Sequence, residues 1–233
     1  MVKWDRMQLL YESALKQVNT KLEILNDEFK VIHQYNPIEH ISSRIKSPES
    51  IAKKIRRKGV PLTVDNIVRY INDIAGIRII CSFTSDIYRI ADLIKDQDDV
   101  KVIKVKDYIK SPKENGYKSY HMIVSVPVYL SDMVVETKVE IQIRTIAMDF
   151  WASLEHKMYY KFEGNAPEHI RKELKECADL VSFLDSKMLL INEEIKTYVP
   201  EDEEESFADE LVNQVPEFMF YSDALAASKG NIG

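Results

Sequence analysis

The clearest pattern of apolar and polar positions lies between Val134 and Arg144, where the two kinds of residue alternate. One face of the predicted strand carries five residues suited to a core: Val135, Thr137, Val139, Ile141 and Ile143. The other face carries five polar residues: Glu136, Lys138, Glu140, Gln142 and Arg144. An aromatic and charged run follows at once, so the polar row points toward a strand end, where α/β folds commonly bind ligands. An ordinary amphipathic strand with a solvated charged face is the alternative.

Shorter patterns of this kind predict three more strands, at 74–83, 100–105 and 119–127, and a helix at 85–95. Apolar residues that recur every three or four positions predict two long helices, from Leu15 to Ile32 and from Ile170 to Ile195. The expected fold is α/β (α+β): a mixed sheet flanked by helices, with long N- and C-terminal helical extensions. We call the apolar stripes along these two helices the helical seams. They are equally consistent with packing on the sheet and with formation of an oligomer.

The expected domains are a helical extension at residues 1–41, an α/β domain at 42–163, and C-terminal helices with an acidic tail at 164–233. No stretch approaches the roughly 18 apolar residues of a membrane span, and the first residues lack a signal peptide's apolar core. We therefore expect a cytoplasmic protein without a membrane partner. Cys81 and Cys177 both occupy apolar patterns and are predicted to be buried thiols.

Charge is unevenly distributed along the 233 residues, whose formal net charge is −6. Residues 42–121 hold 17 Lys and Arg against 10 Asp and Glu, so the middle of the chain is basic and its flanks are acidic. A local positive field favours a polyanionic ligand such as a nucleotide phosphate or RNA.

Much of the basic charge lies in Ser43 to Lys58, SRIKSPESIAKKIRRK. Ser47, Pro48 and Glu49 are a typical helix start. On that helix Lys54 and Arg57 share a face, although a solvated basic ridge would look the same. The few glycines exclude the common glycine-rich phosphate loops. Bound phosphates would therefore be held by Lys and Arg side chains.

Two carboxylates are candidates for a metal site. Asp73 lies where the chain enters an apolar strand that also carries Arg78, and Glu140 lies in the polar row. Together they could hold Mg²⁺, which takes one or two carboxylates plus substrate phosphates. The alternative for Asp73 is a simple turn or capping residue.

The loop KDYIKSPKENGYKSYH, residues 106–121, combines four lysines, three tyrosines and His121. Gly116 frees the backbone beside Tyr117, whose ring could then stack on a planar base, a contact worth ~1–3 kcal/mol. Lys113 and Lys118 are close enough in sequence to meet phosphates. A lysine-rich surface hairpin is the alternative.

Four segments taken together resemble the synthetase domain of the RelA/SpoT family: SRIKSPESI, DIAGIRIIC, KDYIKSPKENGYKSYH and VEIQIRTIAMDFWASLEHKMYYK. They occur in the family's order and cover Ser42 to about Lys161. The short chain most resembles the stand-alone small alarmone synthetases of the RelQ type. Members of that subgroup carry helical extensions and assemble as tetramers, so the resemblance implies a homo-oligomer, with a tetramer favoured.

The resemblance implies a (p)ppGpp synthetase on a nucleotidyltransferase-like sheet, which transfers pyrophosphate from ATP to the 3′-hydroxyl of GTP or GDP in the stringent response. By motif, the ATP site would comprise Arg44, Arg78, Lys46, Lys54 and Arg57, with the first two against adenine. Asp73 and Glu140 would bind Mg²⁺, and Glu140 would take the 3′-hydroxyl proton. Tyr117 would stack on guanine, and the acceptor site would also be lined by Lys113, His121, Gln142 and Arg144.

Some positions depart from the family pattern. Long relatives carry a hydrolase domain with a His-Asp motif, which has no counterpart here, so synthesis without hydrolysis is expected. A patch that in RelQ-type relatives resembles a product-binding site is replaced by Asn19, Glu23 and His40, and Glu23 would repel a phosphate. Asp149 stands where relatives often have Asn, which alters the expected guanine contact.

A different class of function fits the same basic middle. An RNA-binding regulatory module could use Tyr117 and the neighbouring lysines to hold single-stranded RNA. Binding with steep salt dependence and without nucleotide turnover would distinguish such a module from an enzyme.

Overall fold

The computed structural model describes residues 2–33, 35–160 and 166–198. The chain divides into a unit at 1–191 and a second unit at 192–233, of which only 192–198, the end of the last helix, is described. The elements in chain order are α1 (Val2–Val31), β1 (Ile38–Ile45), α2 (Pro48–Arg57), α3 (Val64–Tyr70), β2 (Ala75–Cys81), α4 (Thr84–Lys95), β3 (Lys101–Asp107), β4 (Tyr120–Tyr129), β5 (Val134–Thr145), α5 (Ile146–Tyr160) and α6 (Glu168–Tyr198).

The strands form one sheet in the order β1-β2-β5-β4-β3. β2 and β5 pair in parallel, whereas the other neighbours are antiparallel. In the parallel pair Gly76 lies beside Glu140, and Arg78 lies beside Gln142. His121 of β4 lies opposite Gln142 on its other side. This register places polar residues from several strands in rows across one face.

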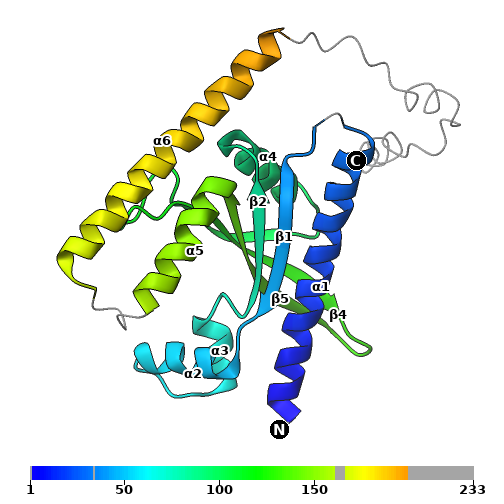
Figure 1. Cartoon of the computed structure of the whole chain (residues 1–233). Coiled ribbons are helices and arrows are strands. Elements are labelled where there is room, and N and C mark those ends of the chain that lie inside the picture. Colours follow the sequence, from blue (N-terminus) through cyan, green and yellow to red (C-terminus); the bar gives the residue numbers. More distant parts are fainter. Residues whose placement is uncertain (1, 34, 161–165, 199–233) are drawn as a thin grey trace, which may run out of the picture. The chain divides into compact units, whose positions relative to one another are not determined.

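The opposite face of the sheet forms the main core under α1 and α4. Ile77, Ile141 and Met122 come from three neighbouring strands and are at most 2% exposed. They belong to one cluster with Leu22 of α1 and Ile90 of α4. α1 runs along the sheet beside β1 (Figure 1). Burying each such side chain contributes about 1.5–3 kcal/mol, so this face fixes the strands that carry the polar rows.

The start of α2 agrees with the sequence prediction. The Ser47 side chain caps the helix by accepting a hydrogen bond from the Ser50 backbone nitrogen at 3.3 Å. Ile51 and Ile55 of this helix are buried in the core. Their burial fixes the rotation of α2, and thereby the side on which Lys54 projects.

The four predicted strands and the helix at 85–95 are confirmed as β2 to β5 and α4. The structure adds β1, an edge strand in which only Ile38 is fully buried. Because neither face of β1 is regularly covered, its sequence lacks the alternation that reveals the other strands. The predicted boundary between residues 41 and 42 falls within this strand.

The two helical seams have different environments. In α1, Val18, Leu22 and Phe29 are buried in the core. In α6 the buried positions are Leu174, Ala178 and Asp185. The prediction that Cys177 is buried is therefore wrong, because the packed side of the helix is offset by one residue, whereas Cys81 is buried as predicted.

Within the described ranges, no helix is long and apolar enough to cross a membrane. The predicted acidic stretch at 201–210, the tail that follows it, and Lys161 at the end of the fourth motif lie outside the described residues.

Candidate active site

Polar residues form two adjacent rows across the exposed face of the sheet. One row runs from Arg44 of β1 past Gly76 to Glu140 of β5. The next runs across four strands, through Arg78, Gln142, His121 and Lys106. Gly76 adds no side chain to its row, and a Cβ built there would meet only the Arg44 carbonyl oxygen, at 4.0 Å. Open space therefore separates Arg44 from Glu140.

Asp73, just before β2, is held by two lysines. The Lys46 and Lys54 ammonium groups donate to its two carboxylate oxygens at 3.0 and 2.8 Å. Burial raises the pKa of Asp73, but the hydrogen bonds from Lys54 and Lys46 outweigh burial, and the net pKa is below the usual value. Asp73 is therefore a carboxylate at neutral pH, and the two cations lie where phosphates could exchange for it.

Glu140 is a partly buried carboxylate whose side chain is 18% exposed. Gln142 Nε2 donates to one of its oxygens at 2.9 Å, and His121 Nδ1 lies 3.6 Å from the other. Burial raises the pKa of Glu140, as does the charge of Asp73, but the contacts with His121 and Gln142 lower it below the usual value. Glu140 is thus ionised and able to accept a proton.

The contacts of Glu140 belong to a closed ring of polar groups. Arg144 donates to Gln142 Oε1 at 3.0 Å and to the Tyr117 hydroxyl at 2.6 Å. The Tyr117 hydroxyl lies 2.8 Å from His121 Nε2, which closes the ring. The direction of this last hydrogen bond depends on the imidazole tautomer. Where the hydroxyl donates to Nε2 of a neutral imidazole, the ring proton is on Nδ1 and faces Glu140.

Asp149 of α5 connects the two arginines of the central strands. Its Oδ1 atom lies 3.3 Å from Arg78 and 3.0 Å from Arg144. Arg144 is almost fully buried, whereas the Arg78 side chain is 36% exposed. Arg78 Nε is buried without a hydrogen-bond partner among the described residues. A buried donor of this kind is costly unless a ligand or water satisfies it.

A cavity of about 260 Å³ brings the two carboxylates together. It is lined by Lys54, Lys58, Tyr70, Asn72, Asp73, Lys104, Lys106, His121, Ile123 and Glu140. Four lysines around two carboxylates give this cavity a net positive charge, which suits a ligand rich in phosphate.

The structure brings most of the sequence-predicted site residues together. Lys113 is near them, but its ammonium group lies 4.4 Å from the centre of the Tyr117 ring, and Arg144 lies 5.1 Å from that centre. A base that stacks on the face beneath Lys113 would displace this exposed side chain. Arg57 is exposed on α2 and does not line the cavity in the part of the chain that the structure describes.

Lys104 and Lys106 line the cavity without having been singled out as site residues from the sequence. They lie opposite Ile123 and His121 in the β3–β4 pair, which directs them to the polar face. The signal that could have identified them is the recurrence of lysine at positions 101, 104 and 106. The step of three residues from Lys101 to Lys104 does not fit a regular strand, and a bulge between residues 102 and 104 accounts for it.

Comparison with known proteins identifies the family. The family model described as "Region found in RelA / SpoT proteins" matches residues 43–165. The chain is 51% identical to GTP pyrophosphokinase YwaC of Bacillus subtilis over 195 residues, which cover 84% of this chain and 93% of YwaC. The structure of small alarmone synthetase 1 from Bacillus subtilis bound to its product pppGpp matches with 36% identity and a TM-score of 0.78, covering 84% of this chain and 100% of that one. The same synthetase bound to AMPCPP matches with 34% identity and a TM-score of 0.72, at the same coverage.

The chain belongs to the RelA/SpoT family, as its four motifs predict. Its fold is that of the small alarmone synthetases, with the predicted mixed sheet flanked by helices.

Proposed function

We propose that this chain is a GTP pyrophosphokinase, a (p)ppGpp synthetase that transfers a pyrophosphate group from ATP to the 3′-hydroxyl of GTP or GDP. Residues 42–163 would form its catalytic domain. The observation that carries the proposal is the closed ring that holds the Glu140 carboxylate in the same cavity as Asp73 and four lysines. The names of YwaC and of the pppGpp-bound synthetase support the same reaction.

In the proposed donor site, Arg44 and Arg78 hold the adenine between guanidinium planes. They come from neighbouring strands and project from the same face, on either side of the open space at Gly76. Guanidinium groups stack well on aromatic rings, and the Arg78 side chain is 36% exposed although its Nε atom is buried. Lys46 and Lys54 would release the Asp73 carboxylate and bind the ATP phosphates instead.

In the proposed acceptor site, guanine stacks on Tyr117 and replaces Lys113 over the ring. That ring is linked to Glu140 through His121, Gln142 and Arg144. The guanine and the carboxylate that takes the proton are thereby held at a fixed separation. Lys104 and Lys106 supply additional positive charge for the two polyanionic nucleotides. Neutralising this repulsion is a precondition for the attack.

Mg²⁺ would be held by Asp73 and Glu140. Both carboxylates line one cavity, and the described residues include no cluster of three or more potential metal ligands. This donor set fits Mg²⁺, which commonly takes only one or two carboxylates and completes its shell with substrate phosphates and water. When bound, the ion would neutralise phosphate charge.

The reaction then requires a single displacement. The 3′-oxygen of the acceptor forms a bond to the β-phosphorus of ATP, the bond from that phosphorus to the α,β-bridging oxygen breaks, and AMP leaves. Glu140 takes the 3′-hydroxyl proton, since it is the ionised carboxylate of the polar row that lies in the cavity.

The test is incubation of the full chain with ATP labelled at the β-phosphate, Mg²⁺ and each of GTP and GDP, with products separated by charge. The expected products carry the label as a 3′-pyrophosphate on the guanine nucleotide, together with unlabelled AMP. Single-stranded RNA binding without any such product, at several Mg²⁺ concentrations, would replace the proposal with an RNA-binding role.

Self-association, with a tetramer favoured, is also proposed. Within residues 1–191, α6 carries apolar side chains that are more than half exposed: Leu180, Phe183, Leu184, Met188 and Leu190. A continuous apolar helix face of this kind is typical of a surface covered by another chain. Light scattering of the wild type and of Phe183→Asp tests it, with a loss of mass expected in the variant.

A further inference from the structure

The loop that carries Tyr117 lies directly on α6. Gly116 has a φ of +85°, and a Cβ built on it would come 2.5 Å from the Ala178 Cβ. No real pair of Cβ atoms is that close, so only glycine allows the loop to approach the helix at this point. The Lys175 backbone oxygen lies on the same side, at 3.8 Å from the built atom.

We call Leu174, Ala178, Val181 and Asp185 the inner face of α6, because their spacing of four, three and four places them on one side of the helix. Leu174 and Ala178 form a small buried cluster with Trp151 of α5, and Tyr117 packs against that cluster. Trp151 Nε1 also donates to the Leu174 carbonyl at 2.9 Å. The inner face thus contacts both the loop and α5.

Asp185 fixes the inner face to the end of β5. Its carboxylate accepts a hydrogen bond from the Thr145 hydroxyl at 2.8 Å. Thr145 directly follows Arg144, the residue that donates to the Tyr117 hydroxyl. α6 therefore lies against the loop that carries Tyr117 at Ala178, and it is bonded to the end of β5, next to Arg144, through Asp185.

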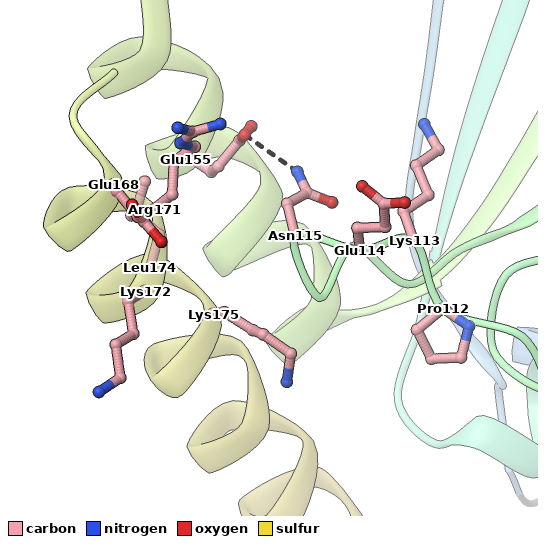
Figure 2. A pocket seen from close by; sticks show the side chains of 10 residues that line it. All are labelled: Pro112, Lys113, Glu114, Asn115, Glu155, Glu168, Arg171, Lys172, Leu174 and Lys175. Carbon is pink, nitrogen blue, oxygen red and sulfur yellow. Dashed lines mark hydrogen bonds between the residues drawn. The ribbon is translucent and has the colours of Figure 1, made fainter. Parts of the chain in front are cut away.

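Beyond this contact, the loop and the helix separate around a pocket of about 1000 Å³, lined by Lys113, Glu114 and Asn115 on one side and by residues of α5 and α6 on the other. Figure 2 shows the loop on one side of this space and the Lys175 side chain on the other. Asn115 crosses to α5 by donating to Glu155 at 3.1 Å. A side chain added at Gly116 would therefore meet Ala178 first and Lys175 next, both of them on α6.

We infer that the inner face of α6 positions the guanine acceptor by setting the place of Tyr117, and that Ala178 is a positioning residue for the transfer reaction. This inference rests on the proposed function, in which Tyr117 stacks on guanine. A larger residue at 178 would push Gly116 and the adjoining Tyr117 away from α6. The donor site on β1 and β2 would be unchanged.

The test compares Ala178→Leu with Cys177→Leu, a matched control at the exposed neighbouring position. Ala178→Leu should raise the KM for GTP about tenfold, because a displacement of about 1 Å is costly at such a site, while the KM for ATP stays within about twofold. Cys177→Leu should change neither constant. Calorimetric titration with GTP alone should show the same loss of affinity without turnover.

A second pair of variants protects the test against simple misfolding. Gly116→Ala should also weaken GTP binding, and adding Ala178→Gly should recover part of it, because the second change removes the atom that the new Cβ meets. Ala178→Leu with unchanged GTP binding, or with equal changes for ATP and GTP, would overturn the inference. A wild type that binds GTP but forms no 3′-pyrophosphorylated product would instead refute the proposed function.

Discussion

Arg144 donates a hydrogen bond to the hydroxyl of Tyr117 at 2.6 Å, which joins the end of a central strand to the tip of a surface loop. The two residues are 27 positions apart in the chain. Arg144 is almost fully buried and is held by Asp149 as well. The ring of Tyr117 therefore has a defined position even though its loop carries exposed lysines.

Substitution of Tyr117 should separate stacking from positioning. Tyr117→Ala should raise the KM for GTP by about 5- to 150-fold, since a base stacked on an aromatic ring gains ~1–3 kcal/mol. Tyr117→Phe keeps the ring but loses the hydroxyl bonded to Arg144 and His121. It should leave the KM for GTP nearly unchanged and lower kcat. Steady-state kinetics at saturating ATP measures both, and identical behaviour of the two variants would contradict the positioning role of the hydroxyl.

Loss of the Glu140 carboxylate should stop catalysis. Glu140→Gln keeps the side chain's shape but removes the proton acceptor, so kcat should fall by about 10²- to 10⁴-fold. Thermal unfolding should be little changed, which shows that the loss is chemical. Glu136→Gln is the matched control, because Glu136 lies on the same face of β5 and is exposed. Undiminished activity of Glu140→Gln would remove Glu140 from the role of base.

Lys54 should contribute to ATP binding, whereas its neighbour Lys53 should not. Lys54 contacts Asp73 and lines the cavity, while Lys53 is exposed elsewhere on α2. Lys54→Ala should raise the KM for ATP by about 10- to 100-fold, which corresponds to one hydrogen bond with a charged group. A comparable rise in the KM for ATP in Lys53→Ala would indicate that Lys54 acts through the general positive charge of α2 and not through a specific contact.

Gly76 leaves the space between Arg44 and Glu140 open. Gly76→Val should be tolerated by the fold, because a Cβ there has ordinary contacts and β-branched residues suit strands. The new side chain would project onto the polar face, where the adenine is proposed to lie. We expect unchanged or raised thermal stability together with a marked rise in the KM for ATP. A variant that binds ATP normally would place the adenine elsewhere.

Asp73 should make stability depend on pH in the acidic range. Its pKa in the folded chain is lowered, so its stabilisation is fully present above the unfolded value of about 3.9 and is lost as the pH falls through the folded value. Asp73→Asn should be about 1–2 kcal/mol less stable than wild type at pH 7, toward the low end because Lys54 is 40% exposed. That difference should shrink below pH ~4. Denaturant unfolding at pH 7 and pH 3 tests it, with the exposed Asp98→Asn as control.

The sequence predicts β5, the capped start of α2 and the Tyr117 loop well, because each follows from a local pattern. Alternation over Val134–Arg144 assigns Glu140 and Gln142 to one face, and the structure places them on the polar side. The ring that joins Glu140 to Tyr117 is not local, since it requires β4 to pair with β5 at one register. The bridge from Asp149 to two arginines depends on how α5 packs and has no counterpart in the periodicity.

The error at Cys177 has a related cause. A spacing of three and four identifies a helix, but several apolar positions in α6 satisfy it, and tertiary contacts choose among them. Gly116 and Trp151 pack against Ala178 and Leu174, so the buried side is one residue away from the apolar seam at Cys177 and Leu184. Part of that seam is thereby left exposed.

The parallel pairing of β2 with β5 has a consequence for how the reactants meet. Arg78, assigned to one nucleotide, and Gln142, assigned to the other, are direct neighbours in a hydrogen-bonded ladder. Many phosphoryl-transfer enzymes close two lobes to assemble their substrates. In the proposed assignment this ladder would hold Arg78 and Gln142 at a fixed separation, so this part of the two half-sites would not depend on the closure of two lobes.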